Sequence, residues 1–146
     1  MLNIFLYLVA SLIFSSSYFT DCKDCTRKEM ATHYRPMVEY VAAQTDLPQH
    51  FIWGYFIMET GGKSNALVNY NNPAGIMKCI NSNCKVNKFE TAQEGIEAWI
   101  RVLNQDVYTE AKACEGEQLY IQMGYIYHPD SKHTLRYKVG KTWNNN

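Results

Sequence analysis

Two stretches of the chain, 26–45 and 91–103, space their hydrophobic residues as one face of an α-helix does. The repeating positions are Met30, Tyr34, Met37, Val38 and Val41 in the first stretch, and Ile96, Trp99, Ile100 and Leu103 in the second. Each pattern predicts a helix that buries one face and leaves the other in water. Pro36 is expected to bend the first helix or to begin it, because proline lacks the backbone donor that a helix interior uses.

The stretch 51–58 is apolar at almost every position, so a helix formed here has no polar face and should be buried nearly all round. Asp46 is suited to cap the beginning of this helix, and Gly61 is suited to end it. Glu59 follows the apolar stretch directly. We expect this helix to pack on the helix of 26–45, with Glu59 at the edge of the core.

Between 75 and 89 the helical repeat stops, and the pattern predicts a short β-hairpin. Met77, Ile80 and Val86 alternate with polar residues around the turn-forming sequence Asn81-Ser-Asn83. Further helices are predicted over 106–112, 117–123 and 130–138, the second running into the segment 124–127. These elements predict an α+β fold that is mainly α and carries a small β-hairpin lobe.

Residues 2–14 form an apolar run that is too short for a typical membrane span and is typical of a signal peptide. Ser15 and Ser17 are small, as a cleavage site requires. We therefore predict a signal peptide over 1–17 and one domain over 18–146, in a protein that is secreted, periplasmic or associated with the cell wall. No stable membrane span is expected after cleavage. The alternative is an uncleaved anchor, because no lysine or arginine precedes the run.

The formal net charge of the chain is zero. Nucleic-acid binders normally carry a surplus of basic residues, so we expect no nucleic-acid partner. Lys78, Lys85 and Lys88 lie on the predicted hairpin and, with Lys63, could face the carboxylates of an anionic glycan. The alternative for these lysines is a solvated surface.

All five cysteines follow the predicted cleavage point, which in an exported chain indicates disulfides and one remaining thiol. Cys79 and Cys84 flank the predicted turn and are expected to link the two strands of the hairpin. Cys114 is then expected to pair with Cys22 or Cys25. A zinc site formed by the other four cysteines is the alternative, but the spacing of the second pair is wider than usual and export favours oxidation. We expect no metal and no cofactor.

Glu59 is the candidate for acid–base chemistry. Its apolar neighbours and the negative end of the helix dipole both favour the protonated carboxyl group, as a general acid requires. The alternative is an ordinary surface glutamate. The stretch 69–78 that follows offers small residues, which let backbone approach a ligand, and amides, which can bind hydroxyl and acetamido groups.

Four short segments, in the same order along the chain, resemble lysozyme-like peptidoglycan hydrolases, and in particular the autolysin and flagellar-type glucosaminidase family. Met58-Glu-Thr-Gly-Gly-Lys-Ser64 resembles the E-S-G-x-x-S segment, and Asn71-Asn-Pro-Ala-Gly-Ile76 resembles N-N-x-x-G-I. Phe89-Glu-Thr-Ala-Gln-Glu-Gly-Ile96 is similar to the aromatic-x-S/T-x-x-E helix start. Gly124-Tyr-Ile-Tyr-His-Pro-Asp130 is similar to G-Y-x-x-D-P, with His128 in place of the aspartate.

The resemblance implies a lysozyme-like domain in which Glu59 is the catalytic acid. Tyr125 is the preferred tyrosine beside it, with Tyr127 second. The remaining residues of these segments that are expected to bind substrate are Ser64, Asn71, Asn72, Gly75 and Ile76. Many glycosidases use a second carboxylate, yet 79–89 contains no aspartate or glutamate, so the candidates are Glu90 or none.

We therefore expect a monomeric hydrolase that cleaves β-1,4 bonds between the N-acetylated sugars of peptidoglycan, of the endo-β-N-acetylglucosaminidase type. With a single acid, the 2-acetamido group of the substrate would stabilise the reacting carbon. A lytic transglycosylase is the second possibility, because Gly75-Ile-Met-Lys78 also resembles that group's G-L-M-Q segment. Alternatives of another class are a catalytically silent glycan-binding domain on the same fold and a disulfide-stapled interaction module.

Overall fold

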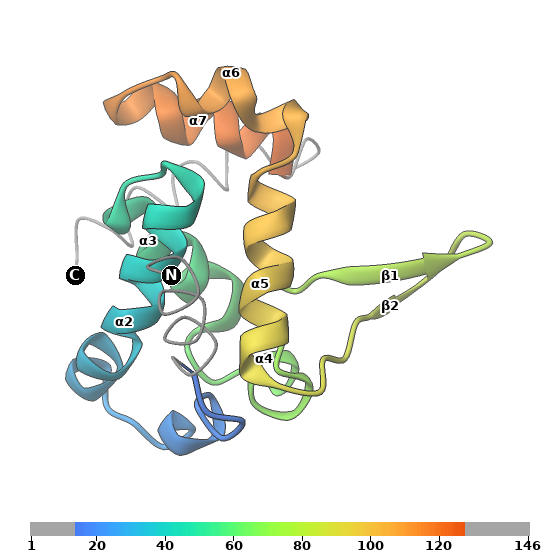
Figure 1. The fold of residues 1–146 in the computed structure, drawn as a ribbon. Helices are drawn as coiled ribbons and strands as arrows, with labels where there is room; N and C mark the ends of the chain where they lie inside the picture. Colours follow the sequence, from blue (N-terminus) through green and yellow to red (C-terminus); the bar gives the residue numbers. More distant parts are fainter. Residues whose placement is uncertain (1–13, 128–146) are drawn as a thin grey trace, which may run out of the picture.

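The computed structural model describes residues 14–127, and these residues are mainly helical with one small antiparallel sheet (Figure 1). In chain order the elements are η1 (Thr20–Cys22), α2 (Arg27–Thr45), α3 (Gln49–Thr60), α4 (Asn65–Tyr70), β1 (Met77–Ile80), β2 (Asn83–Val86), α5 (Ala92–Leu103), η2 (Asp106–Tyr108), α6 (Thr109–Lys112) and α7 (Gly116–Tyr127). The predicted mainly α, α+β class is confirmed. The helix predicted over 130–138 lies outside the described residues.

The predicted helix over 26–45 is confirmed as α2, which begins at a complete capping box between Thr26 and Glu29. Pro36 lies inside α2 on its exposed side. The prediction that Asp46 caps the next helix is wrong. Asp46 instead ends α2 in a left-handed conformation, and Pro48 occupies the position before α3. Only three residues separate the two helices, and the first of them, Asp46, closes α2 rather than opening α3.

Helix α3 is the buried centre of the fold, as its continuous apolar sequence predicts. Phe51, Ile52 and Phe56 are fully buried, and none of the residues from 51 to 60 is exposed. Tyr34 of α2 packs edge-on against Phe56, with 4.8 Å between the ring centroids. Gly61 ends α3 with a φ of 59°, the left-handed conformation that glycine adopts without strain. This helix therefore carries Glu59 from the core to its boundary.

Helix α5 is drawn beside α3, and α6 and α7 lie at the C-terminal end of α5 (Figure 1). Thr91 caps α5 by accepting a hydrogen bond from the backbone N–H of Glu94. The predicted buried stripe is confirmed, and Trp99 is 1% exposed, so it is a core residue rather than a sugar platform. Among residues 14–127 no helix has both the length and the apolar character needed to cross a membrane.

The hairpin stands away from the helical body (Figure 1), with β1 and β2 paired so that Cys79 lies opposite Cys84. The predicted disulfide between these two residues is confirmed. The expected bond from Cys114 to the N-terminal cysteines is wrong, because Cys22 pairs with Cys25 and Cys114 is a free thiol. A bond between residues three apart closes a much shorter loop, so it costs less chain entropy than a bond to the distant Cys114.

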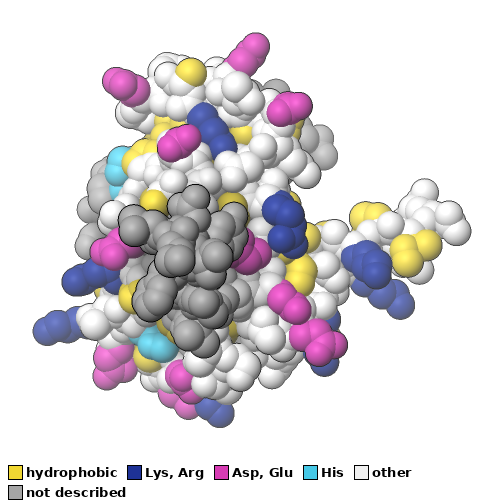
Figure 2. Space-filling view, viewed as in Figure 1, with side chains coloured by type: hydrophobic (Ala, Val, Ile, Leu, Met, Phe, Trp, Pro, Cys, Tyr) yellow, Lys and Arg dark blue, Asp and Glu magenta, His cyan; other side chains and the backbone are white. Residues whose placement is uncertain are grey.

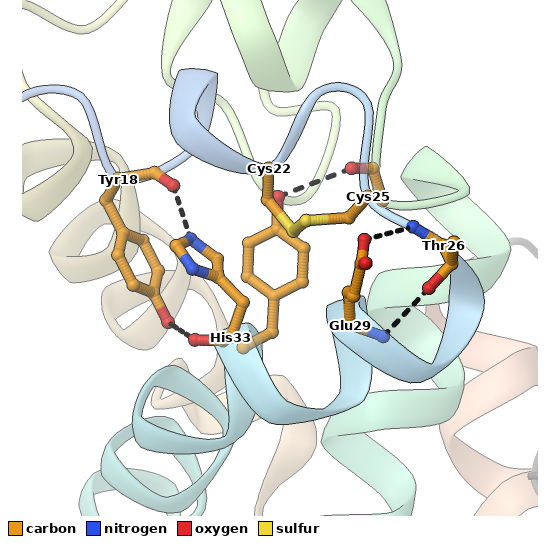
Figure 3. Close-up of a disulfide and its surroundings, with 8 residues drawn as sticks. Tyr18, Cys22, Cys25, Thr26, Glu29 and His33 are labelled. Carbon is orange, nitrogen blue, oxygen red and sulfur yellow. Dashed lines mark hydrogen bonds between the residues drawn. A yellow bond between two sulfur atoms is a disulfide. The ribbon is translucent and has the colours of Figure 1, made fainter.

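The N-terminal segment folds onto α2 around the Cys22–Cys25 disulfide (Figure 3). Tyr18 donates from its hydroxyl to the backbone oxygen of His33, while the His33 ring lies 2.6 Å from the backbone oxygen of Tyr18. Phe14 is 7% exposed and packs against the rings of Tyr18 and Tyr40. Phe14 falls within the segment 1–17 that is predicted to be removed as a signal peptide. Cleavage after Ser17 would therefore remove this packed ring from the mature chain.

Candidate functional site

A cleft of about 270 Å³ lies at the C-terminal end of α3, where Glu59 reaches the protein surface. Its wall brings together α3, the loop before β1, the first residue of β1, the end of α5 and η2. The residues that line it are Glu59, Ala74, Gly75, Ile76, Met77, Val102 and Tyr108. Three of the residues predicted from the sequence, Glu59, Gly75 and Ile76, therefore share one cleft.

Glu59 and Gly75 both line this cleft, and the side chain of Glu59 lies near the backbone of Gly75. A β-carbon on Gly75 would stand 3.6 Å from Oε2 of Glu59, and Gly75 has a φ of 62° that a larger residue rarely adopts. Glycine at this position lets the backbone of the loop lie beside the carboxyl group and keeps the cleft open there. The Glu59 side chain is itself half-buried. A ligand in the cleft would therefore meet the carboxyl group directly.

Asn72 holds the loop that carries Gly75 and Ile76. Its amide nitrogen donates to the backbone oxygens of Ile76 and Asn87, at 2.9 Å each, and its oxygen accepts from the backbone N–H of Ile76. The side chain is fully buried, with no surface left for a sugar. In the structure its amide shapes the loop, and the expected role of Asn72 in substrate binding stays a prediction.

Asn71 and Ser64 also have structural roles. Asn71 ends α4 in a left-handed conformation and donates from its amide to the backbone oxygens of Phe89 and Glu90. Ser64 caps the beginning of α4 by accepting from the backbone N–H of Leu67. Neither residue lines the cleft. Asn71 and Ser64 thus hold backbone groups in place. The residues that line the cleft are mostly apolar.

Tyr125 and Tyr127 belong to the last part of α7, but their side chains lie outside the described residues. Their predicted roles beside Glu59 stay predictions. Tyr108 is a tyrosine that sequence reasoning missed: it lines the cleft from η2 and is 6% exposed. Burial raises the pKa of its hydroxyl group above the ordinary value of 10.0. A tyrosine hydroxyl is protonated at neutral pH even without this shift, so it can donate a hydrogen bond. The sequence pattern of η2 gave no signal for this placement.

Among the described residues that line the cleft, Glu59 is the one carboxylate. Glu90 is exposed and outside the lining, and the carboxylate of Glu94 accepts from the backbone N–H of Glu90 at the start of α5. Glu97 is half-buried and accepts hydrogen bonds from Tyr40 and Gln93. The described cleft therefore offers one acid, not a pair.

The described residues contain no group of three or more His, Cys, Asp or Glu side chains suited to hold a metal ion. The four cysteines considered for zinc are engaged in two separate disulfides. Comparison with family models, with curated proteins and with solved structures finds no match to this chain. The chemistry of the cleft therefore has to be argued from its own residues.

Proposed function

We propose that this protein is a peptidoglycan hydrolase on a lysozyme-like fold that cleaves β-1,4 bonds between N-acetylated sugars, with Glu59 as the general acid. The observation that carries the proposal is the position of Glu59. Its half-buried carboxyl group is the one acid of the described cleft and faces Gly75, which leaves room for a sugar oxygen beside it. The resemblance of four sequence segments to the glucosaminidase family supports the same residue.

The proposed reaction needs one proton and one nucleophile. Glu59 gives its proton to the bridging oxygen as the bond from that oxygen to the anomeric carbon breaks. The acetamido oxygen of the substrate then bonds to the anomeric carbon, as in substrate-assisted glycosidases. Attack by water on this intermediate releases the acetamido group and returns a proton to Glu59. This route needs no second carboxylate, which fits the composition of the described cleft.

Lytic transglycosylation is the second candidate, because a single acid suits it equally well. In that reaction the 6-hydroxyl group of the same sugar attacks in place of water and produces a 1,6-anhydro end. The sequence Gly75-Ile-Met-Lys78, which resembles a lytic transglycosylase segment, also runs along this cleft: Gly75, Ile76 and Met77 line it.

Digestion of purified peptidoglycan, followed by mass analysis of the new glycan ends, tests the proposal. A reducing N-acetylglucosamine end supports the hydrolase, and a 1,6-anhydro end supports the transglycosylase. Glu59→Gln should lower the rate by about 100-fold or more, since it removes the acid but keeps the shape. Glu90→Gln makes the same chemical change at an exposed position and should leave the rate nearly unchanged.

A silent glycan-binding domain gives a different result in the same experiment. The wild-type protein would then pellet with peptidoglycan while the glycan stays intact over a range of pH. Glu59→Gln would pellet equally well. An interaction module with no glycan function would show neither binding nor cleavage.

A further inference from the structure

The hairpin of β1 and β2 carries most of the large hydrophobic side chains that the described residues expose. Ile80 is 62% exposed, Met77 is 49% exposed and Val86 is 39% exposed. Within residues 14–127 the one other exposed side chain of this kind is Val107 in η2. Single exposed hydrophobic residues are normal on a protein surface, whereas a group of them marks an interaction surface. The grouping on one short hairpin therefore indicates a partner.

The three exposed hydrophobic side chains lie on both faces of the hairpin. Residues directly opposite each other in an antiparallel pair point to the same side of the sheet, and successive residues alternate sides. Met77 is opposite Val86, on the face that also carries the Cys79–Cys84 disulfide. Ile80 lies on the other face. A partner that contacts all three side chains must therefore surround the hairpin rather than cover one face.

The face of Ile80 also carries two cations, because Lys78 is directly opposite Lys85. From residue 77 to residue 89 the chain contains no aspartate or glutamate. Like charges in this position destabilise an antiparallel pair, and all eight strand residues are exposed, so no core packing offsets the repulsion. Met77 lines the cleft from the opposite face, and neither lysine is part of the cleft wall. The two charges thus suit an anionic partner outside the cleft.

The hairpin projects from the helical body and ends in a narrow turn (Figure 1). Figure 2 shows hydrophobic side chains together with Lys or Arg side chains on the projecting part. Asn81 and Ser82 form the two-residue turn, with φ values of 49° and 67°. Ile80 is the last residue of β1 and so lies beside the tip. The projecting end therefore combines a hydrophobic tip with two lysines behind it.

We propose that the hairpin binds the surface of an anionic phospholipid membrane. Ile80 enters the boundary between headgroups and acyl chains, and Lys78 and Lys85 contact the lipid phosphates. A lipid surface is deformable and surrounds an inserted tip, so it covers hydrophobic side chains on both faces at once. The described sheet has two strands, so the outer edge of each strand keeps unpaired backbone groups. This confines the hairpin to the headgroup region, because hydrocarbon offers those groups no hydrogen bonds.

A second copy of the hairpin fits this surface less well than lipid does. Pairing of two hairpins edge to edge would bring two pairs of lysines together without an acidic residue between them. A folded protein that covers one face would leave the hydrophobic side chains of the other face in water. Both occupants give results of their own in the test.

Sedimentation with vesicles tests the proposal. The probes are vesicles of phosphatidylcholine and vesicles of phosphatidylcholine mixed equally with phosphatidylglycerol. We expect the protein to prefer the anionic vesicles by about tenfold or more at low ionic strength. Lys78→Gln with Lys85→Gln should reduce binding to the anionic vesicles about tenfold, and salt at about 0.5 M should have a similar effect. Ile80→Ser should reduce the same binding about three- to tenfold.

Matched variants control for hydrophobicity and for net charge. Val107→Ser removes a similarly exposed aliphatic side chain away from the hairpin and should keep the binding. Lys23→Gln with Lys28→Gln makes the same change in net charge at exposed positions in and just before the first turn of α2, and it should keep the preference for anionic vesicles. All variants share the same N-terminal segment, so the differences among them report on the hairpin.

Fluorescence of Ile80→Trp tests insertion directly. Its emission should shift to shorter wavelength with the anionic vesicles, by more than the emission of the wild-type protein shifts. An absent shift would overturn insertion of the tip. An equal loss of binding in the Lys23 and Lys28 control would mean that only net charge matters, which would also overturn the site.

Other outcomes assign the hairpin to a different partner. Binding to peptidoglycan sacculi but not to vesicles, lost in the same hairpin variants, would overturn the membrane site. Unchanged vesicle binding with self-association of the Lys78→Gln, Lys85→Gln variant would overturn it too, and would show that the lysines keep the strand edges apart. The proposal is independent of the proposed function: Glu59→Gln should bind the anionic vesicles as the wild-type protein does, whether or not the wild type cleaves glycan.

Discussion

Gly95 of α5 lies against the backbone carbonyl of Asn71, so closely that a β-carbon on Gly95 would stand 1.7 Å from that oxygen. No side chain fits between the helix and the loop at this point. The contact presses the loop that follows α4 onto α5, and this loop carries Gly75 and Ile76 to the cleft beside Glu59. A glycine remote from the carboxyl group thus helps to set the shape of the site.

Gly95→Ala should therefore destabilise the fold. The new β-carbon meets backbone rather than a movable side chain, so helix and loop must separate, at a cost of about 3 kcal/mol or more. Chemical denaturation measures this change. Arg101→Ala, at an exposed position of the same helix, should stay within about 0.5 kcal/mol of wild type. Equal stability of the two variants would contradict the close contact.

Asn72→Ala should loosen the loop at the cleft. The variant loses the hydrogen bonds from the Asn72 amide to the backbone oxygens of Ile76 and Asn87, and the one that Asn72 accepts from the N–H of Ile76. We expect this loss to cost on the order of 3 kcal/mol of stability. The N–H of Ile76 donates to the Asn72 side chain in the wild type, so amide hydrogen exchange at Ile76 should become faster in the variant. Asn69→Ala removes an exposed amide that donates to the side chain of Asn65, and it serves as the matched control. Slow exchange at Ile76 in the Asn72 variant would refute this role.

Tyr108→Phe should lower the rate of glycan cleavage about tenfold with little change in stability. The substitution removes only the hydroxyl group of a residue that lines the cleft and keeps its ring. Steady-state rates on peptidoglycan fragments measure the effect. Tyr120→Phe is the control, since within residues 14–127 the buried Tyr120 hydroxyl has no hydrogen-bond partner. A normal rate for Tyr108→Phe would remove this residue from the reaction.

Removal of Phe14 should destabilise the N-terminal segment. Phe14→Ala deletes a buried ring between Tyr18 and Tyr40 and should cost about 3 kcal/mol. A chain that begins at Tyr18, as cleavage after Ser17 would leave it, should show a similar loss. The mass of the exported protein identifies its first residue. A stable mature chain that begins at Tyr18 would show that the packing of Phe14 is dispensable.

Stability should fall at alkaline pH because of Tyr34. Burial raises the pKa of Tyr34 from its ordinary value of 10.0 to about 12 in the folded chain. The neutral form is therefore favoured by folding, and its full contribution is present below about pH 10 and is lost as the pH rises towards 12. Thermal unfolding between pH 8 and pH 12 should show a steeper decline for wild type than for Tyr34→Phe. Parallel curves would contradict this assignment.

The sequence alone determined the elements whose signal is local. The apolar run of α3, the one-sided repeats of α2 and α5, and the turn at Asn81-Ser-Asn83 each act through neighbours a few residues away. The Cys79–Cys84 bond follows for the same reason, because the turn itself brings the two residues together. The sequence also determined the position of Glu59 at the end of a buried helix, because the apolar run and the glycines that follow it are local signals.

Only the tertiary structure decided what surrounds Glu59. Tyr108 and Val102 reach the cleft because α5 packs beside α3, and nothing in their own sequence segments encodes that meeting. The burial of Asn72 could not be predicted either, because its four hydrogen bonds depend on backbone groups up to fifteen residues away. Periodicity and capping report which face is buried, but the identity of the residues across a cleft depends on how separate elements pack.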